Sequence, residues 1–290
     1  MSQRVIRQLY AHGKILELST PKVMGILNVT PDSCSRYHGV DRALAHAESM
    51  IADGVHIIDI GGESTRPNAT AVGTDEELRR VVPVVQAIRS AFGDEIWLSL
   101  DTSNPAVMQA GIESGADIIN DVRALRRDGA VQMAAKLGVP VVLMHSRGEP
   151  DTMDELAVYT DVIREVIDEL SHSIERAVSA GVAREQLVID VGMGFAKTYE
   201  HHKVLMTQLD TFIRHFDLPM LFGVSRKRFL GEILQRTGLD SLQNHQPHDR
   251  DIIGAGMSLL AVQQGASIVR VHDVAKSVQM LSMWQQIYGE

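Results

Sequence analysis

The chain has 290 residues, a formal charge of −9 at pH 7 and an apolar fraction of 44%. The length fits one large domain or two small ones. The acidic balance argues against general nucleic-acid binding, and the aromatic fraction of 4% argues against stacking platforms for single strands. No apolar run reaches the ~20 residues needed to span a bilayer, and we expect no signal peptide. The single cysteine, Cys34, excludes an internal disulfide and suits a reducing cytoplasm.

The first twenty residues predict a β-hairpin ahead of the main fold. Two short alternating segments between Val5 and Leu18 flank the tetrapeptide Ala11-His12-Gly13-Lys14, which is the pattern of two strands joined by a turn. We therefore expect residues 1–20 to form a hairpin that closes a barrel. No linker or compositional break follows, so residues 21–290 are expected to form one domain.

From residue 21 onwards, short apolar strands alternate with helical patterns. The expected strands are 23–29, 57–60, 96–100, 117–119, 139–144, 187–189, 219–224 and 268–273. The expected helices are 41–53, 76–92, 105–114, 130–137, 160–180, 198–216, 252–265 and 274–288. The segment 236–249, rich in Gln, Asn, His and Pro, is expected to be a polar loop or insertion.

The alternation of strands and helices predicts the class of fold. Such alternation implies a parallel sheet, and eight strand–helix units in ~250 residues are typical of a (β/α)8 TIM barrel. A doubly wound open sheet is the structural alternative. The barrel is favoured because polar residues end all eight strands, which suits one common mouth. No Gly-x-Gly-x-x-Gly turn follows the first strand, and this weakens a dinucleotide-binding interpretation.

Polar side chains stand at the ends of the expected strands. They are Asn28, Asp59, Asp101, Asn120, His145, Asp190, Ser225 with Lys227, and Arg270 with His272. In a barrel these side chains converge at the carboxyl-terminal face, where such enzymes place their sites. Each has a structural interpretation when taken alone: Asp59 can cap a helix, and a lone histidine such as His145 is more often a core residue. Their recurrence at one face favours a binding site.

One group of these residues suits a flat heterocycle. Asp101, Asn120 and Asp190 offer hydrogen-bond acceptors and one amide, which match N–H donors along the edge of a guanidine-like pyrimidinone. The carbonyl oxygen of Asn28 suits a hydrated Mg²⁺, an ion that needs few protein ligands when phosphate and water complete its shell. No Cys/His cluster has zinc spacing, and no Gly-x-Ser-x-Gly elbow appears.

A second group suits phosphate or a carboxylate. The run Ile57–Ile60 breaks into two glycines and a polar loop that contains Arg66, whose guanidinium is a planar, permanently charged fork. Lys227, Arg270 and His272 are cationic or can become so. One such loop is as often an ordinary strand-to-helix turn as a binding loop, but the pattern recurs along this chain.

Several segments resemble the dihydropteroate synthase family. They are Met-Gly-Ile-Leu-Asn-Val-Thr-Pro-Asp-Ser at 24–33, Gly-Gly-Glu-Ser-Thr-Arg-Pro at 61–67, Ile-Asn-Asp at 119–121, Ser-Arg-Lys at 225–227 and Arg-Val-His-Asp at 270–273. The resemblance runs from about residue 23 to 274. It implies a cytoplasmic, homodimeric TIM-barrel enzyme of folate biosynthesis and a target of sulfonamides. Such enzymes join 6-hydroxymethyl-7,8-dihydropterin diphosphate to p-aminobenzoate with Mg²⁺ present, and they release pyrophosphate.

The resemblance also implies a role for individual positions. The pterin would be held by Asp101, Asn120, Asp190 and Lys227. The diphosphate would be held by Asn28, Thr65, Arg270 and His272, with the metal on Asn28. The p-aminobenzoate side would contain Thr65, Arg66, Pro67, Arg226 and Arg228. The catalytic residues would be Asp101, Lys227 and Arg270, with Asp101 stabilising a cation on the pterin methylene.

The chain departs from the family pattern in two loops. The family's first loop usually reads Pro-Asp-Ser-Phe-Ser-Asp-Gly-Gly, whereas here Cys34 stands in place of the aromatic residue and Arg36 in place of the second acid. After the sixth strand the usual Asp-Pro-Gly is Asp-Val-Gly at 190–192, and a later glycine is Ala196. These changes concern the p-aminobenzoate half and leave the pterin and phosphate residues in place.

Three functions compete on these residues. The first is an active synthase. The second is a diverged paralogue that binds a pterin with weak or absent transfer to p-aminobenzoate, which Cys34 and Arg36 favour. The third is another barrel enzyme on phosphorylated substrates, which the acceptor set disfavours. The last two helices carry Met257, Leu260, Met280, Leu281 and Met283, which either supply an apolar dimer face or, for most of them, belong to the core.

Overall fold

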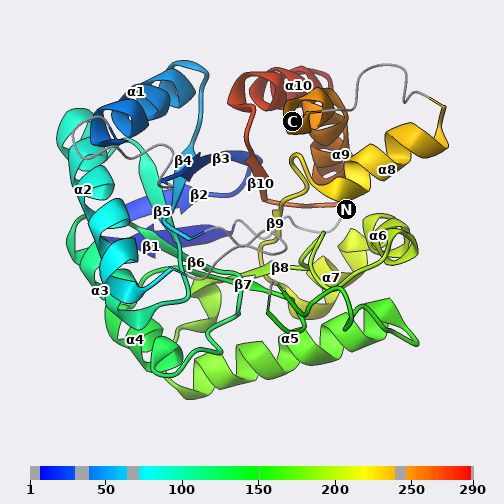
Figure 1. The fold of residues 1–290 in the computed structure, drawn as a ribbon, viewed down its shortest axis with the longest axis horizontal. Coiled ribbons are helices and arrows are strands. Elements are labelled where there is room, and N and C mark those ends of the chain that lie inside the picture. Colours follow the sequence, from blue (N-terminus) through cyan, green and yellow to red (C-terminus); the bar gives the residue numbers. More distant parts are fainter. Residues whose placement is uncertain (1–6, 30–38, 64–71, 150, 239–245, 289–290) are drawn as a thin grey trace.

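The computed structural model describes residues 7–29, 39–63, 72–149, 151–238 and 246–288. Within them, eight parallel strands form a barrel with helices around it (Figure 1). The strands are β3 (Lys22–Asn28), β4 (Ile57–Gly61), β5 (Trp97–Asp101), β6 (Ile118–Asp121), β7 (Val141–Met144), β8 (Leu187–Asp190), β9 (Leu221–Phe222) and β10 (Ile268–Val271). They pair in the order β8-β7-β6-β5-β4-β3-β10-β9. A parallel bridge between Ile189 and Met220 closes the ring, so the predicted TIM barrel is confirmed.

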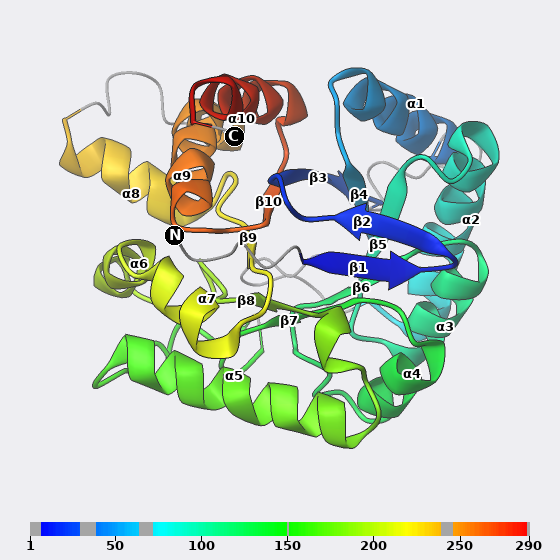
Figure 2. The same cartoon turned by 180° about the vertical axis from the view of Figure 1, so that it is seen from behind.

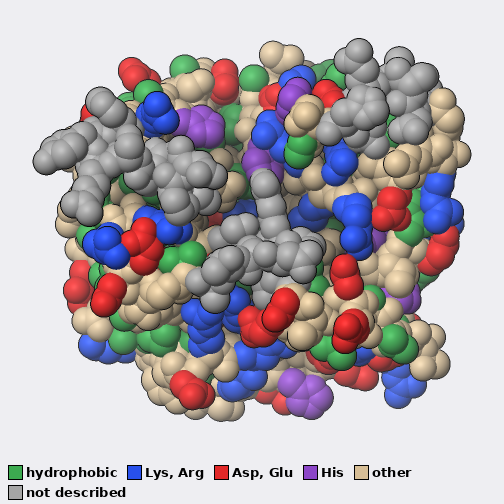
Figure 3. All heavy atoms as spheres, viewed as in Figure 1, with side chains coloured by type: hydrophobic (Ala, Val, Ile, Leu, Met, Phe, Trp, Pro, Cys, Tyr) green, Lys and Arg blue, Asp and Glu red, His purple; other side chains and the backbone are tan. Residues whose placement is uncertain are grey.

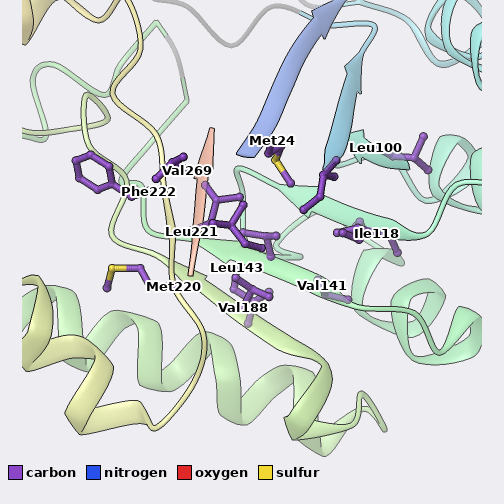
Figure 4. Packing of buried hydrophobic residues seen from close by; sticks show 14 of the residues in the cluster. Met24, Leu100, Ile118, Val141, Leu143, Val188, Met220, Leu221, Phe222 and Val269 are labelled. Atoms are coloured by element: carbon purple, nitrogen blue, oxygen red, sulfur yellow. The ribbon is translucent and has the colours of Figure 1, made fainter. Parts of the chain in front are cut away.

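The core of the barrel is built from short apolar strands that are buried throughout. All residues of β4 to β9 are buried, which fits a sheet covered on its outer face by helices. Figure 4 shows buried side chains from different strands in this core, among them Met24, Leu143 and Val188. The polar strand ends are therefore fixed by a rigid, close-packed scaffold.

The helices follow the strands along the chain. They are α1 (Gly39–Ala52), α2 (Thr74–Phe92), α3 (Pro105–Glu113), α4 (Ala130–Leu137), α5 (Val162–Ser179), α6 (Tyr199–Met206), α7 (Leu209–Phe216), α8 (Arg228–Arg236), α9 (Asp251–Gln263) and α10 (Val274–Tyr288). The 3-10 turns η2 (Arg184–Gln186) and η4 (Pro247–Arg250) precede β8 and α9. Side-chain caps set several starts: Asp161 accepts hydrogen bonds of 3.1 Å from the N–H groups of Ile163 and Arg164, as N-cap residues do.

Two segments differ from the helices expected from the sequence. The single helix expected over 198–216 is two helices, because Gln264 inserts between them. Its side-chain oxygen accepts from the N–H of Leu209 at 2.9 Å, and its amide donates to the carbonyl of Met206 at 2.6 Å. Helix α8 is not among the helices that the sequence pattern predicts. It follows Lys227 directly and uses part of the segment between β9 and α9.

The N-terminal hairpin lies across the amino-terminal end of the barrel (Figure 2). It pairs β1 (Gln8–Ala11) with β2 (Lys14–Glu17) in antiparallel register. The backbone N–H of Tyr10 donates to the side chain of Gln186 at 3.0 Å, and Lys14 lies 2.6 Å from Asp117. Because Gln186 and Asp117 directly precede β8 and β6, the hairpin covers the end of the barrel opposite the polar strand ends.

None of the helices in the described ranges is long and apolar enough to cross a membrane.

Candidate active site

The centre of the candidate site is a buried ion cluster organised by Arg270 of β10. Its Nε donates to Oδ2 of Asp59 at 2.6 Å, and its Nη2 donates to Oδ2 of Asp101 at 2.6 Å. The amide of Asn120 donates to the same Asp59 oxygen at 3.0 Å. Strand register explains the convergence, because Asp101 stands beside Asn120 in neighbouring strands. The structure therefore brings together three of the predicted site residues and adds Asp59.

The charges of this cluster are strongly coupled. Burial raises the pKa of Asp101 to about 7, although Arg270 opposes that shift by favouring the carboxylate. Burial acts to lower the pKa of Arg270, but Asp59 and Asp101 outweigh it and keep that pKa above its ordinary value. The guanidinium thus stays charged, while Asp101 can change its protonation near neutral pH. A carboxyl group poised in this way is common where a site must stabilise a developing charge.

Asp190, which is buried, and Lys227, which is half-buried, form the other half of the cluster. Asp190 ends β8, and its Oδ1 accepts from the N–H of Gly192 at 2.7 Å. Lys227 precedes α8, donates to the carbonyl of Met193, and lies 4.5 Å from the centre of the Phe195 ring. Burial raises the pKa of Asp190, and Lys227 opposes that rise. Burial lowers the pKa of Lys227 to about 8. Each charge therefore depends on the other in a region of low dielectric.

A close backbone approach positions the loop after β8. Gly192 has a φ of +69°, and a Cβ atom there would lie 1.8 Å from the carbonyl oxygen of His145. The position therefore requires glycine. Because the N–H of His145 also donates to the carbonyl of Asp190 at 2.8 Å, the ends of β7 and β8 are held together where the loop begins.

His272 and Asn28 lie at the ends of β10 and β3. The backbone N–H of His272 donates to the Ser225 hydroxyl oxygen at 3.0 Å, and the ring Nδ1 lies 3.0 Å from the same atom. A hydroxyl that accepts from the backbone can donate its own proton to Nδ1, which places the ring N–H on Nε2. The side chain of Asn28 is exposed. Figure 3 shows basic and histidine side chains around the middle of this face.

Comparison with known proteins assigns the chain to a family. The model of the pterin binding enzyme family matches residues 24–272. Dihydropteroate synthase of Haemophilus influenzae is 44% identical over 282 residues, which cover 96% of this chain and 98% of that protein. The chain belongs to the dihydropteroate synthase family.

Solved structures of family members have the same fold. The structure of Xanthomonas albilineans dihydropteroate synthase with 4-aminobenzoic acid has a TM-score of 0.89 and 42% identity, and it covers 99% of this chain and 100% of that one. The Yersinia pestis dihydropteroate synthase with a sulfonamide drug has a TM-score of 0.89 and 43% identity, with 98% and 100% covered. The resemblance inferred from the sequence motifs is confirmed.

Not all of the residues assigned from the dihydropteroate synthase family join the buried cluster. The Nε and Nη2 atoms of Arg226 donate to the two carboxylate oxygens of Asp251 in α9, each at 2.8 Å. The side chain of Arg228 is 71% exposed. Its Nη2 lies 3.6 Å from Oδ2 of Asp154, and its Nε lies 3.7 Å from Oε1 of Glu232. Thr65, Arg66 and Pro67 lie outside the described residues, as do Cys34 and Arg36. The p-aminobenzoate assignments therefore stay predictions.

Two buried ionisable residues have no role assigned from the sequence. The first is Asp59, a polar strand end for which the family resemblance implies no ligand role; it is fully buried and shares Arg270 with Asp101. The second is Lys197, whose side chain is buried beside His145. No local pattern in the sequence marks it, because lysine is usually exposed and its burial depends on contacts with a distant residue.

Proposed function

We propose that this protein is an active dihydropteroate synthase. The observation that carries the proposal is the cluster of Asp101, Asn120 and Arg270 at one end of the barrel, in a chain that spans nearly the whole length of synthases such as the one from H. influenzae. The reaction would join 6-hydroxymethyl-7,8-dihydropterin diphosphate to p-aminobenzoate and release pyrophosphate. The comparisons favour this function over a diverged paralogue that binds a pterin without transfer.

The pterin would be bound by the buried acceptors. The carboxylates of Asp101 and Asp190 accept hydrogen bonds from ring and exocyclic N–H groups, and Asn120 supplies an amide. Lys227 adds a cation beside Asp190. These groups are fixed before the substrate arrives, which limits the entropy lost when the ring is ordered.

The diphosphate would lie towards Asn28, Arg270 and His272, with Thr65 in the adjacent loop. Arg270 brings a permanent positive charge and His272 a ring N–H, and both suit phosphate oxygens. Among the described residues, no group of three or more His, Cys, Asp or Glu side chains could hold a metal. A site made of one Asn28 oxygen with substrate and water oxygens suits Mg²⁺. When bound, this ion would neutralise charge on the diphosphate.

Bond breaking would precede bond making. The bond between the pterin methylene carbon and the diphosphate oxygen breaks, and Arg270 and Lys227 stabilise the negative charge that leaves. Asp101, ionised beside Arg270, stabilises the positive charge on the methylene carbon. The amine nitrogen of p-aminobenzoate then forms the new C–N bond and loses a proton. The protein contributes mainly positioning and preorganised charge.

The second substrate would bind near the mouth, with Thr65, Arg66, Pro67, Arg226 and Arg228 around it. The X. albilineans synthase structure contains 4-aminobenzoic acid, which supports p-aminobenzoate as the second substrate. The Y. pestis synthase structure contains a sulfonamide drug, and we propose that sulfonamides bind at the same position in this chain. In this chain Asp251 already pairs with Arg226, so that arginine would shape the site more than it would neutralise a carboxylate.

A coupled assay of pyrophosphate release tests the proposed function. We expect release from the pterin diphosphate to require p-aminobenzoate, and the product to have the mass of dihydropteroate. Asp101→Asn, which keeps the volume of the side chain but removes the charge, should lower kcat strongly. Release that does not depend on p-aminobenzoate, or no release from folded protein, would point to the paralogue instead.

We also infer a homodimer, built on an apolar face of α9 and α10. Ile252 is 70% exposed, Met283 is 47% exposed and Ile287 is 62% exposed, and large exposed apolar patches mark interaction sites. Of the residues expected there, Leu260 and Met283 are exposed, Met257 and Met280 are half-buried, and Leu281 belongs to the core. Ile252→Glu should give a monomer in sedimentation experiments, whereas Ile15→Glu on the hairpin should not.

A cytoplasmic location is proposed on the chain's single cysteine, which suits a reducing compartment. Cell fractionation followed by immunoblotting would test it.

A further inference from the structure

A buried lysine outside the assigned site lies against the loop that begins at Asp190: a Cβ atom built at Gly192 would be 3.4 Å from its Nζ. The side chain of Lys197 belongs to the loop between β8 and α6, and the residue is only 5% exposed. Its Nζ lies 2.9 Å from Nδ1 of His145 and donates to the carbonyl of Phe195 at 3.0 Å. A buried ammonium group costs free energy unless it is paired, so its retention here needs a reason.

The partners of His145 fix the direction of this contact. Nε2 of His145 lies 3.0 Å from a carboxylate oxygen of Glu169, and a carboxylate only accepts, so Nε2 carries the proton. Nδ1 is then the acceptor for Lys197. Burial lowers the pKa of His145 to about 4, which keeps the ring neutral. Glu169 is itself held by Arg147, whose Nε donates to it at 2.9 Å.

Hydrogen bonds hold successive residues of the loop that contains Lys197. The N–H of Gly192 donates to Asp190 at 2.7 Å, Met193 accepts from Lys227, and the N–H of Gly194 donates to His202 at 2.8 Å. Lys197 completes the series at Phe195. Lys197 and Lys227 therefore hold two carbonyls of one short loop, and this loop begins at Asp190.

We propose that Lys197 is a positioning residue for pterin binding: it holds the β8–α6 loop and supplies the positive charge that keeps Asp190 ionised. This inference rests on the proposed function, because it takes Asp190 to be the acceptor for the pterin edge. The role differs from that of Lys227, which the family assigns to the ligand itself.

The electrostatic surroundings support a charge role. Burial raises the pKa of Asp190, and the cations Lys227, Lys197 and Arg270 act against that rise. Burial lowers the pKa of Lys197 to about 7, while Asp190 acts to raise it. Several other charged or titratable groups face Lys197. Glu169 favours its positive charge. The groups that disfavour it are Arg147, Lys227, His201 and His202. An ionised Asp190 is an acceptor only, whereas protonation turns one of its oxygens into a donor.

The sign of the pH effect follows from these contacts. Removal of the Lys197 charge leaves Asp190 with fewer cations, so its pKa rises and it takes up a proton at higher pH. An opposite charge nearby typically shifts a carboxyl pKa by about one unit or more. The acid limb of pterin binding, that is the pH below which binding is lost, should therefore rise by about one unit. The difference should shrink as the pH rises through about 7, where Lys197 itself loses its proton.

The test compares folded variants by calorimetric titration with 6-hydroxymethylpterin between pH 5.5 and 9. We expect Lys197→Met to move the pH at which binding is lost on the acid side upwards by about one unit, and to weaken binding about tenfold at pH values below that point. Lys197→Gln, which keeps a hydrogen-bond donor without the charge, should give the same shift and provides the test should the Met variant not fold. Lys203→Gln removes an exposed lysine of α6 that pairs with Glu200 and should change neither quantity.

Kinetics separate positioning from a general structural effect. The lysine variants should raise KM for the pterin diphosphate more than they lower kcat, because chemistry occurs once Asp190 is engaged. An unchanged affinity and acid limb in both folded lysine variants would overturn the inference. Asp190→Asn is the reference for the proposed function: lost pterin binding in that variant, with binding intact in the lysine variants, would refute only the role of Lys197.

Discussion

The Nη2 atom of Arg270 donates a 2.6 Å hydrogen bond to Oδ2 of Asp101. The two residues stand on strands β10 and β5, which are not neighbours in the sheet, so their side chains meet across the mouth of the barrel. Burial raises the pKa of Asp101, and Arg270 is the largest influence that lowers it again. The ion pair therefore decides at which pH the site contains a carboxylate.

Arg270→Met should damage the site in two measurable ways. The acid limb of kcat/KM should move upwards from about pH 7, because Asp101 loses the cation that favours its ionised form. The dissociation constant for pyrophosphate should rise at least tenfold, or ~1.4 kcal/mol. Arg270→Lys is the control, since it retains the charge while losing the fork. If the dissociation constant for pyrophosphate changes neither with the mutation nor with Mg²⁺, the diphosphate site lies elsewhere.

Asn120→Ala should reduce both pterin affinity and stability. The Asn120 amide donates to Asp59 at 3.0 Å, so its removal leaves a fully buried carboxylate with one partner fewer. A buried polar group that loses a partner costs about 1–3 kcal/mol, which urea unfolding would detect. Gln109→Ala removes an exposed amide paired with Glu113 and should be neutral. Unchanged pterin affinity in Asn120→Ala would remove this residue from the binding site.

The sequence predicts the barrel and the polar residues that end its strands. Strand ends are predictable because each buried strand is an apolar run with an abrupt polar stop, as in Ile118-Ile119-Asn120. The break between α6 and α7 was not predictable, because it depends on Gln264, which is 55 residues from Leu209 in sequence. Long-range hydrogen bonds of this kind leave no local pattern.

The site was predictable in its members but not in its pairings. The sequence identifies Asp101, Asn120 and Arg270 as strand ends, yet it does not show that Asp59 lies between two of them. The burial of Lys197 was missed for a related reason. Lysine is usually exposed, and only the packing of the loop against His145 removes this one from water.

Asp117→Asn should destabilise the protein without changing kcat. Asp117 is fully buried at the amino-terminal end of the barrel, where it lies 2.6 Å from Lys14 and 2.7 Å from Arg89. Neutralising it leaves two largely buried cations without their carboxylate, at a cost of roughly 3–5 kcal/mol. Asp94→Asn removes an exposed partner of the same Arg89 at 3.5 Å and should not change the stability measurably. Equal unfolding curves for the two variants would contradict this role.

Ala196→Gly should stabilise the protein. Ala196 has a φ of +47°, in the left-handed region that costs a residue with a Cβ atom about 1–2 kcal/mol. The greater freedom of glycine in the unfolded chain offsets part of that gain, so we expect roughly 0.5–1 kcal/mol in urea unfolding. The same change at Ala45, an exposed position inside α1, should instead lower stability. A loss of stability at both positions would show that the buried methyl of Ala196 contributes more than its backbone strain costs.

The first loop should limit use of the second substrate. Cys34 offers no aromatic face, so a stacking contact with the p-aminobenzoate ring worth about 0.5–1.5 kcal/mol is missing. Arg36 reverses a charge near a methylene carbon that becomes positive, and this should raise the barrier. The same arginine could attract the carboxylate of p-aminobenzoate. We therefore expect weak p-aminobenzoate and sulfonamide binding alongside ordinary pterin binding.

The double change Cys34→Phe with Arg36→Asp tests the loop directly. It should lower the KM for p-aminobenzoate and raise kcat, because it restores both the stacking face and the negative charge. Steady-state kinetics at saturating pterin diphosphate would measure both constants, and each single variant would separate the ring from the charge. If the unmodified protein already binds p-aminobenzoate well and the double variant gains nothing, another residue of the loop, such as Tyr37 or His38, must cover the substrate.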